Sequence, residues 1–145
     1  MTQNKNLQLA SDLRTVVARL IKKLRKTSVT GQMLSLTERS TMSALQQHKQ
    51  LLPSELASME KITNQSMSQV LNHLLELGFI IRTASETDRR KVLISLCEEG
   101  ERVWMRVKSE RDEWLANAIQ ETFNEEEEEL LKKLIAPLTR LVDFE

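Results

Sequence analysis

The sequence predicts a mainly α-helical protein that carries a winged helix-turn-helix. Only three glycines and two prolines interrupt its 145 residues, a composition that suits long helices. Apolar residues recur at helical spacing along most of the chain and change to the spacing of β-strands only after Gly78. We therefore expect one domain of about six helices with a β wing of two to three strands.

The first helix is expected over residues 7–26, where leucine and valine side chains follow one another at helical steps. These apolar positions are Leu13, Val17, Leu20 and Leu24. The opposite face is basic and suits either solvent or DNA phosphates; it consists of Arg14, Arg19, Lys22, Lys23, Arg25 and Lys26.

The next two helices have recognisable first residues. Ser35 and Glu38 form a capping box, which predicts a helix that runs to about Gln46. Pro53 suits the first turn of a short helix that ends near Glu60, because an N–H group in that turn has no partner inside the helix.

A third segment, residues 64–77, has the features of a helix that projects from the protein. Thr63 is a good N-cap, and Gly78 supplies the left-handed residue that ends the helix. A solvated face normally carries Glu and Lys, yet neither occurs from Thr63 to Leu75. The outward positions are instead short and polar: Asn64, Gln65, Ser66, Ser68, Gln69 and Asn72.

Two strand-like runs, residues 79–82 and 92–96, then predict a hairpin with a charged tip. The tip holds Arg89, Arg90 and Lys91, and arginine on a thin projection suits a narrow, electronegative minor groove. Asp88, two residues before Arg90, can hold that guanidinium in a fixed orientation.

Two helices are expected to complete the chain. The first covers about residues 99–121, with an inward face made of Val103, Val107, Trp114, Ala118 and Ile119. Asn124 caps the second helix, whose first turns hold Glu125–Glu129. Pro137 is expected to kink or end that helix.

A short helix, a tight turn, a capped polar helix and a β-ribbon, in that order, form a helix-turn-helix with a wing. Asn and Gln can pair with adenine, Ser can donate or accept, and free N–H groups at the helix start can bind a phosphate. Thr63 and the outward positions of the polar helix therefore become candidate major-groove contacts. The charges agree: residues 1–97 carry 14 Lys and Arg against 7 Asp and Glu, and residues 98–145 carry the reverse.

Residues 56–78, LASMEKITNQSMSQVLNHLLELG, followed by FIIRTASETDRRKVLISLCEEG, resemble the MarR family of bacterial transcriptional regulators. The likeness rests on the leucine-alanine pair, the glycine after the polar helix and the Asp-x-Arg wing, and it extends over nearly the whole chain. It implies a homodimer built by helices within 7–30 and 99–145, with a DNA-binding lobe over 35–96. By resemblance Arg90 enters the minor groove and Asp88 orients it.

The resemblance further implies a sequence-specific repressor on a pseudopalindromic operator in double-stranded DNA, released by a small anionic or aromatic effector. Four positions depart from the family pattern. Cys97 stands where threonine is usual, Glu60 replaces a core leucine, and Lys61 replaces a small turn residue. A shift of the turn is expected to let Met59 fill the core. The polar helix, residues 64–77, is the recognition helix by this resemblance, and it lacks the arginine that is common there in the family.

Other functions were weighed against DNA binding. His48 and His73 lie far apart without a pattern of carboxylates, so we expect no enzyme, no cofactor and no metal site. The single Cys97 fits a reducing, cytoplasmic setting and leaves open a redox-responsive regulator. A helical protein-interaction module that does not bind DNA is the other alternative. The N-terminus shows no signal-like or membrane-spanning stretch.

Overall fold

The computed structural model describes the backbone of residues 2–145 and the side chains from residue 5 onward. It confirms a mainly α-helical fold with six α-helices and one antiparallel hairpin. The elements in order are α1 (Thr2–Thr27), a 3₁₀ turn η1 (Thr30–Met33), α2 (Leu36–His48), α3 (Pro53–Glu60), α4 (Asn64–Glu76), β1 (Ile80–Ala84), β2 (Val92–Leu96), α5 (Glu98–Thr122) and α6 (Glu125–Val142).

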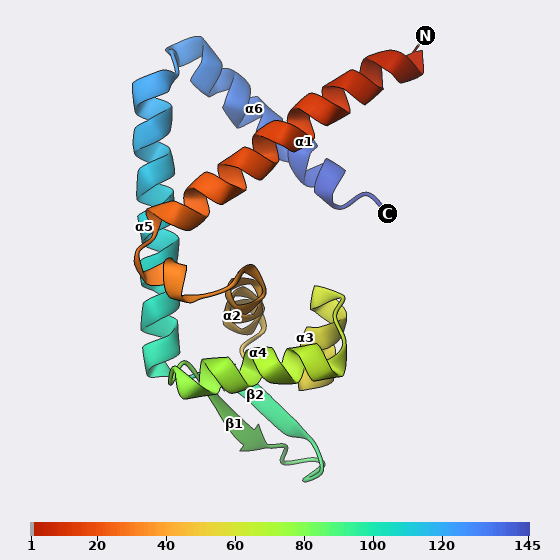
Figure 1. Cartoon of the computed structure of the whole chain (residues 1–145), viewed down its shortest axis with the longest axis vertical. Coiled ribbons are helices and arrows are strands. Elements are labelled where there is room, and N and C mark those ends of the chain that lie inside the picture. Colours follow the sequence, from red (N-terminus) through yellow and green to blue (C-terminus); the bar gives the residue numbers. More distant parts are fainter. Residues whose placement is uncertain (1) are drawn as a thin grey trace.

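The chain divides into a compact lobe and two projecting helices, as Figure 1 shows. Helices α2, α3 and α4 and the hairpin form the lobe, and the hairpin extends beyond α4 at the lower end of the picture. Helix α5 begins beside the lobe and runs up one side of the molecule. Helix α6 starts from the far end of α5, whereas α1 meets α5 near its middle, and in this view α1 and α6 cross at a distance from α5. We call α1 and α6 the arms.

Local caps begin three of these helices at the predicted residues. The Ser35 hydroxyl accepts from the Glu38 N–H at 3.1 Å, and the Glu38 carboxylate accepts from the Ser35 N–H at 3.0 Å. Thr63 caps α4 by accepting from the Ser66 N–H. Asn124 caps α6 in a second capping box. Each cap satisfies N–H groups that a helix leaves without partners.

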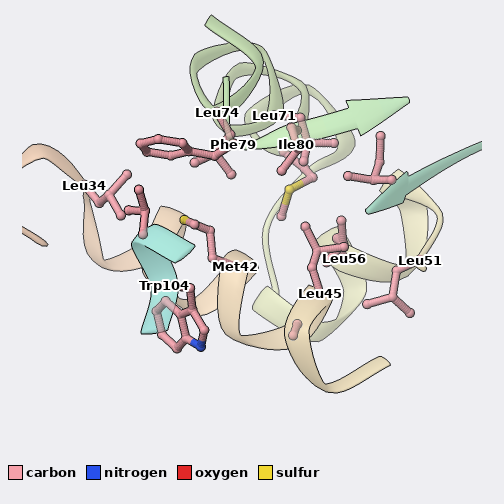
Figure 2. Close-up of a cluster of buried hydrophobic side chains, with 14 of the residues drawn as sticks. Leu34, Met42, Leu45, Leu51, Leu56, Leu71, Leu74, Phe79, Ile80 and Trp104 are labelled. Atoms are coloured by element: carbon pink, nitrogen blue, oxygen red, sulfur yellow. The ribbon is translucent and has the colours of Figure 1, made fainter. Parts of the chain in front are cut away.

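One cluster of sixteen apolar side chains forms the core of the lobe. Figure 2 shows Met42 and Leu45 from α2 facing Leu71 and Leu74 from α4, with Phe79 and Ile80 beside them. Trp104 of α5 closes one side of this cluster. The recognition helix thus rests on α2, and the foot of α5 belongs to the same core.

Two glycines have conformational or steric reasons for their positions. Gly78, with φ +78°, ends α4 in the left-handed conformation that the sequence predicts. Gly100 lies so close to β1 that an added Cβ would meet the Phe79 carbonyl oxygen at 1.9 Å. Helix α5 can therefore pack against the start of β1 only with glycine at residue 100.

The wing has two strands, and its third partner is a single residue. Strand β1 pairs antiparallel with β2, with Ile80 opposite Leu96 and Arg82 opposite Ile94. Leu51, before α3, adds one isolated bridge to Ile94. The first strand starts at Ile80 and not at Phe79, because the N–H of Phe79 bonds to the Leu74 carbonyl at the end of α4.

The structure corrects one local expectation and narrows another. Met59 is 47% exposed and does not fill the core; Ile62 packs against the core instead. Lys61, at φ 55° and ψ 42°, turns the chain so that Ile62 points inward. Of the two effects expected of Pro137, ending the helix is excluded, because α6 continues to Val142.

A polar joint connects the arm α1 to the lobe and to α5. Ser28 and Thr30 donate to the Glu110 carboxylate of α5, at 2.7 and 3.1 Å. The Ser28 hydrogen bond is the main reason why the pKa of Glu110 lies below its usual value. Arg39 of α2 is buried and donates to the carbonyls of Gly31 and Arg25. The end of α1 is therefore tied to both neighbours.

The arms leave broad apolar faces uncovered. No residue of α6 is buried, although its sequence is strongly amphipathic, and α1 buries no side chain among its described residues. Leu130, Ile135 and Leu141 of α6 are more than half exposed, as are Leu7, Leu9 and Val16 of α1. No helix of the described chain is both long and apolar enough to cross a membrane.

Candidate nucleic-acid interface

The outward side of α4 is a polar stripe that contains three of the predicted contacts. Gln65, Gln69 and Asn72 follow at helical steps and are all exposed, whereas Met67, Leu71 and Leu74 on the opposite side are buried. Glu76 continues the stripe by one turn. The sequence reasoning did not single out Glu76, although its spacing from Asn72 places it on the same face.

The remaining predicted residues of α4 lie at its start and flanks. Asn64, Ser66 and Ser68 are exposed. The Thr63 hydroxyl donates to the Ser66 Oγ at 3.0 Å while it accepts from the Ser66 N–H. This leaves the Ser66 hydroxyl proton free to donate outward, and the first N–H groups of α4 also face an open end of the helix.

Two side-chain contacts hold α4 from opposite flanks. On one flank the His73 ring Nδ1 hydrogen-bonds with the Glu38 carboxylate of α2. On the other flank Arg82 of β1 donates from Nη2 to the Asn72 Oδ1 at 3.0 Å. Together they resist rotation of α4 about its axis and so fix which side chains face outward.

The Glu38 carboxylate is buried within the capping box that begins α2. Burial alone would raise its pKa, but hydrogen bonds from Ser35 and His73 outweigh burial and lower the pKa below its ordinary value. The ionised form of Glu38 is thus the form that joins α2 to the recognition helix.

The wing tip presents Arg89, Arg90 and Lys91 as exposed side chains. The Asp88 carboxylate accepts from the backbone N–H of Arg90 at 3.1 Å, and the Lys91 N–H donates to the Asp88 carbonyl at 3.0 Å. In residues 5–145 no ion pair joins Asp88 to the Arg90 guanidinium. Asp88 therefore hydrogen-bonds to the backbone of Arg90, whereas the sequence predicted that it would orient the guanidinium of Arg90.

The turn between α3 and α4 accommodates the two unusual residues of the motif. Lys61 takes the left-handed conformation, and its N–H donates to the Ser58 carbonyl at 3.2 Å. Glu60 is half-buried, and its carboxylate accepts from the Ser40 hydroxyl of α2. A carboxylate at residue 60 thus joins α3 to α2 through a hydrogen bond.

Cys97 lies away from the outward face of α4. It occupies the N-cap position of α5 and is half-buried, and its thiol donates to the Gly78 carbonyl at 2.9 Å. Among the described residues no group of three His, Cys, Asp or Glu side chains is arranged to hold a metal ion.

The structure brings most of the predicted contacts together. The polar stripe of α4 and the basic wing tip are both exposed, and the hairpin begins beside the end of α4 (Figure 1). Sequence reasoning missed Arg82, because its contact with Asn72 depends on how β1 packs against α4. One indication was present in the sequence: Asn64–Glu76 contains no Lys or Arg, so a cation beside this helix has to come from another element.

This combination of a capped polar helix and a basic wing defines a winged helix-turn-helix regulator. Residues 34–92 match the model of the MarR family. An HTH-type transcriptional regulator of Mycobacterium bovis, named as uncharacterised, is 32% identical over 136 residues, which are 94% of each chain. The chain belongs to the MarR family of transcriptional regulators.

Solved structures agree with this assignment. A proposed transcriptional regulator of Pseudomonas aeruginosa has a TM-score of 0.86 and 31% identity, over 98% of this chain and 99% of its own. A mutant of MepR from S. aureus, solved with a bound oligodeoxyribonucleotide, has a TM-score of 0.70 and 22% identity, over 93% and 96% of the two chains. At that identity the second likeness concerns the fold.

Proposed function

We propose that this regulator binds double-stranded DNA sequence-specifically as a homodimer. The observation that carries the proposal is the exposed polar stripe of α4, together with a projecting wing tip that has three exposed cations. Helix α4 fits a major groove, and a thin basic hairpin fits the adjacent minor groove. The oligodeoxyribonucleotide held by the S. aureus neighbour supports the same use of this fold.

The homodimer follows from the arms. Their apolar faces are uncovered in a single chain, and burying them would remove a large apolar surface from water. A second copy offers the same faces, so a twofold pair of α1 and α6 helices covers both sets. We assign residues 7–30 and 99–145 to dimerisation and residues 35–96 to the DNA-binding lobe.

Two lobes related by a twofold axis would bind a pseudopalindrome, with half-sites about one helical turn apart. We propose repression as the outcome, because a dimer that occupies both grooves of a promoter excludes other proteins from it. A small anionic or aromatic effector would release the DNA by changing the joint where Arg39 and Glu110 tie α1 to the lobe and α5. The cytoplasm is the compartment in which such a regulator meets DNA.

The test is a titration with a mixed-sequence duplex at several salt concentrations. We expect affinity to fall steeply with salt, because each phosphate contact releases counterions. Absence of binding at low salt would contradict the proposal.

Two variants test the site itself. Arg90→Ala is expected to weaken binding by about 1–3 kcal/mol, and an unchanged affinity would refute the wing contact. Gln69→Ala is expected to change sequence preference while the salt dependence stays the same. An equal loss on all sequences would show that Gln69 touches only the DNA backbone.

A further inference from the structure

Arg82 projects from the wing onto the flank of the recognition helix. It lies opposite Ile94 in the hairpin register, so it shares a face of the ribbon with the buried Ile80 and Ile94. That face packs against α4, and the long side chain reaches Asn72, where Nη2 donates to Oδ1 at 3.0 Å. Both side chains are nevertheless exposed to solvent.

This contact decides what the pair can offer to DNA. Adenine pairs with an asparagine amide that both donates and accepts, and in this structure Arg82 takes one of the two lone pairs of the Asn72 Oδ1. Asn72 keeps one lone pair and the two donors of its amide nitrogen, and Arg82 keeps its other N–H groups. The pair therefore offers mostly donors, which fit the acceptors of DNA: phosphate oxygens or the guanine edge.

The place of the pair favours phosphate. Arg82 is the middle residue of β1, the strand that leads from the end of α4 to the wing tip. If α4 lies in the major groove and the wing in the minor groove, the sugar-phosphate backbone between the two grooves runs past this point. We infer that Arg82, positioned by Asn72, binds a backbone phosphate there; the inference rests on the proposed DNA binding.

The charges around α4 support a contact between Arg82 and a phosphate. Helix α4 carries no Lys or Arg, and Glu76 stands one turn beyond Asn72 on the same stripe. A carboxylate there repels a nearby phosphate, so the recognition helix needs a cation from another element. Arg82 supplies that cation, and the hydrogen bond to Asn72 holds it beside the helix.

The test compares Arg82→Met with Lys108→Met, which removes an exposed charge from α5. Methionine keeps a long apolar side chain, so the packing of residue 82 against α4 is retained. Each variant is titrated with a mixed-sequence duplex and with a duplex of A·T pairs only, at several salt concentrations. For Arg82→Met we expect about tenfold weaker binding on both duplexes and a salt slope smaller by about 1. Lys108→Met should match the wild type.

Two outcomes would overturn the phosphate contact. A loss confined to the mixed-sequence duplex, with an unchanged slope on A·T pairs, would mean that Arg82 contacts guanine. Wild-type affinity and slope in Arg82→Met would mean that Arg82 only supports the fold. In both cases the wild type still binds DNA, whereas a wild type that binds neither duplex at low salt defeats the proposed function itself.

Asn72 is a positioning residue in this account, and a double-mutant cycle tests that role. Asn72→Ala should weaken binding to the A·T duplex about threefold when Arg82 is present, and not at all in the Arg82→Met background. The salt slope should not change with Asn72→Ala alone. Additive losses would show that Asn72 acts independently of Arg82 and would overturn the coupling.

Discussion

The lobe buries sixteen apolar side chains in one cluster, whereas the arms α1 and α6 bury none in the part of the chain that the structure describes. Both regions are rich in leucine and isoleucine at helical spacing. In the lobe the partners of these side chains come from the same chain, through α2, α4 and the foot of α5. In the arms these side chains remain exposed in the single chain, and the proposed dimer would supply their partners.

This difference separates two sources of stability. The lobe has local caps, a closed core and glycines fitted to close contacts, so its fold is determined within one chain. Of the arms, α6 has a capping box, but neither arm has a core, and an isolated amphipathic helix gains little stability in water. Substitutions in the lobe should therefore act on folding, while substitutions in the arms should act through association.

The largest effect is expected from Leu134→Asp on α6. If the proposed dimer covers this half-exposed leucine, a carboxylate there is buried without a partner and costs about 4 kcal/mol of dimer stability. Analytical ultracentrifugation should show monomers. Leu134→Met is the control and should remain dimeric.

The same variant asks whether the lobe depends on the arms. We expect the near-ultraviolet circular dichroism that arises from the buried Trp104 to persist in Leu134→Asp monomers, because Trp104 packs in the lobe core. Loss of that signal together with the dimer would contradict the separation of the two regions.

Gly100→Ala tests the connection between the lobe and α5. The new methyl group would meet the Phe79 carbonyl at 1.9 Å, and two backbones must separate to admit it. We expect about 3 kcal/mol less free energy of unfolding, measured by urea denaturation. Gly78→Ala is the matched control: its Cβ meets nothing within 4 Å, and only its positive φ costs about 1 kcal/mol. Equal losses would argue against the close contact.

Acid should weaken the lobe through Glu38. Its pKa is lower in the folded chain, so the unfolded chain takes up the proton first as the pH falls. The stabilisation is complete above the ordinary value of about 4.5 and disappears as the pH falls through the lower, folded pKa. Urea titrations should show that Glu38→Gln loses less free energy of unfolding than the wild type when the pH is lowered from neutral to below 4.5. Glu121→Gln, on exposed α5, should follow the wild type.

The smallest effect is expected at Thr41 in α2. Its hydroxyl is buried and has no hydrogen-bond partner among the described residues. Thr41→Val keeps the shape of the side chain and removes the unpaired hydroxyl. We therefore expect the free energy of unfolding, measured by thermal denaturation, to rise by about 0.5–1 kcal/mol. Thr41→Ser, which keeps the hydroxyl, should not gain stability.

The features that depend on near neighbours in sequence were predictable. Ser35, Thr63, Asn124 and Gly78 each end or begin a helix through contacts within four residues, so their patterns are visible in the sequence. The polar stripe of α4 follows from helical spacing in the same way. The wing was predictable because the spacing of apolar residues changes from that of a helix to that of a β-strand after Gly78.

The features that were missed join distant residues or depend on one backbone angle. Arg82 meets Asn72, and His73 meets Glu38, only after β1 and α2 have packed against α4. The left-handed turn at Lys61 decided that Ile62 and not Met59 enters the core. Pro137 stays within α6, because the carbonyl that loses a partner belongs to the exposed Lys133 and can be hydrated.

The close contact at Gly100 also makes α5 a lever. Its foot is fixed to the lobe at Phe79, and its 25 residues span about 37 Å to the start of α6 at 1.5 Å per residue. A tilt of α5 by about 5° about its α6 end therefore moves the lobe by about 3 Å, close to the rise of one base pair. In a twofold pair the two displacements add, so small changes in how the arms cross would change the distance between the two recognition helices.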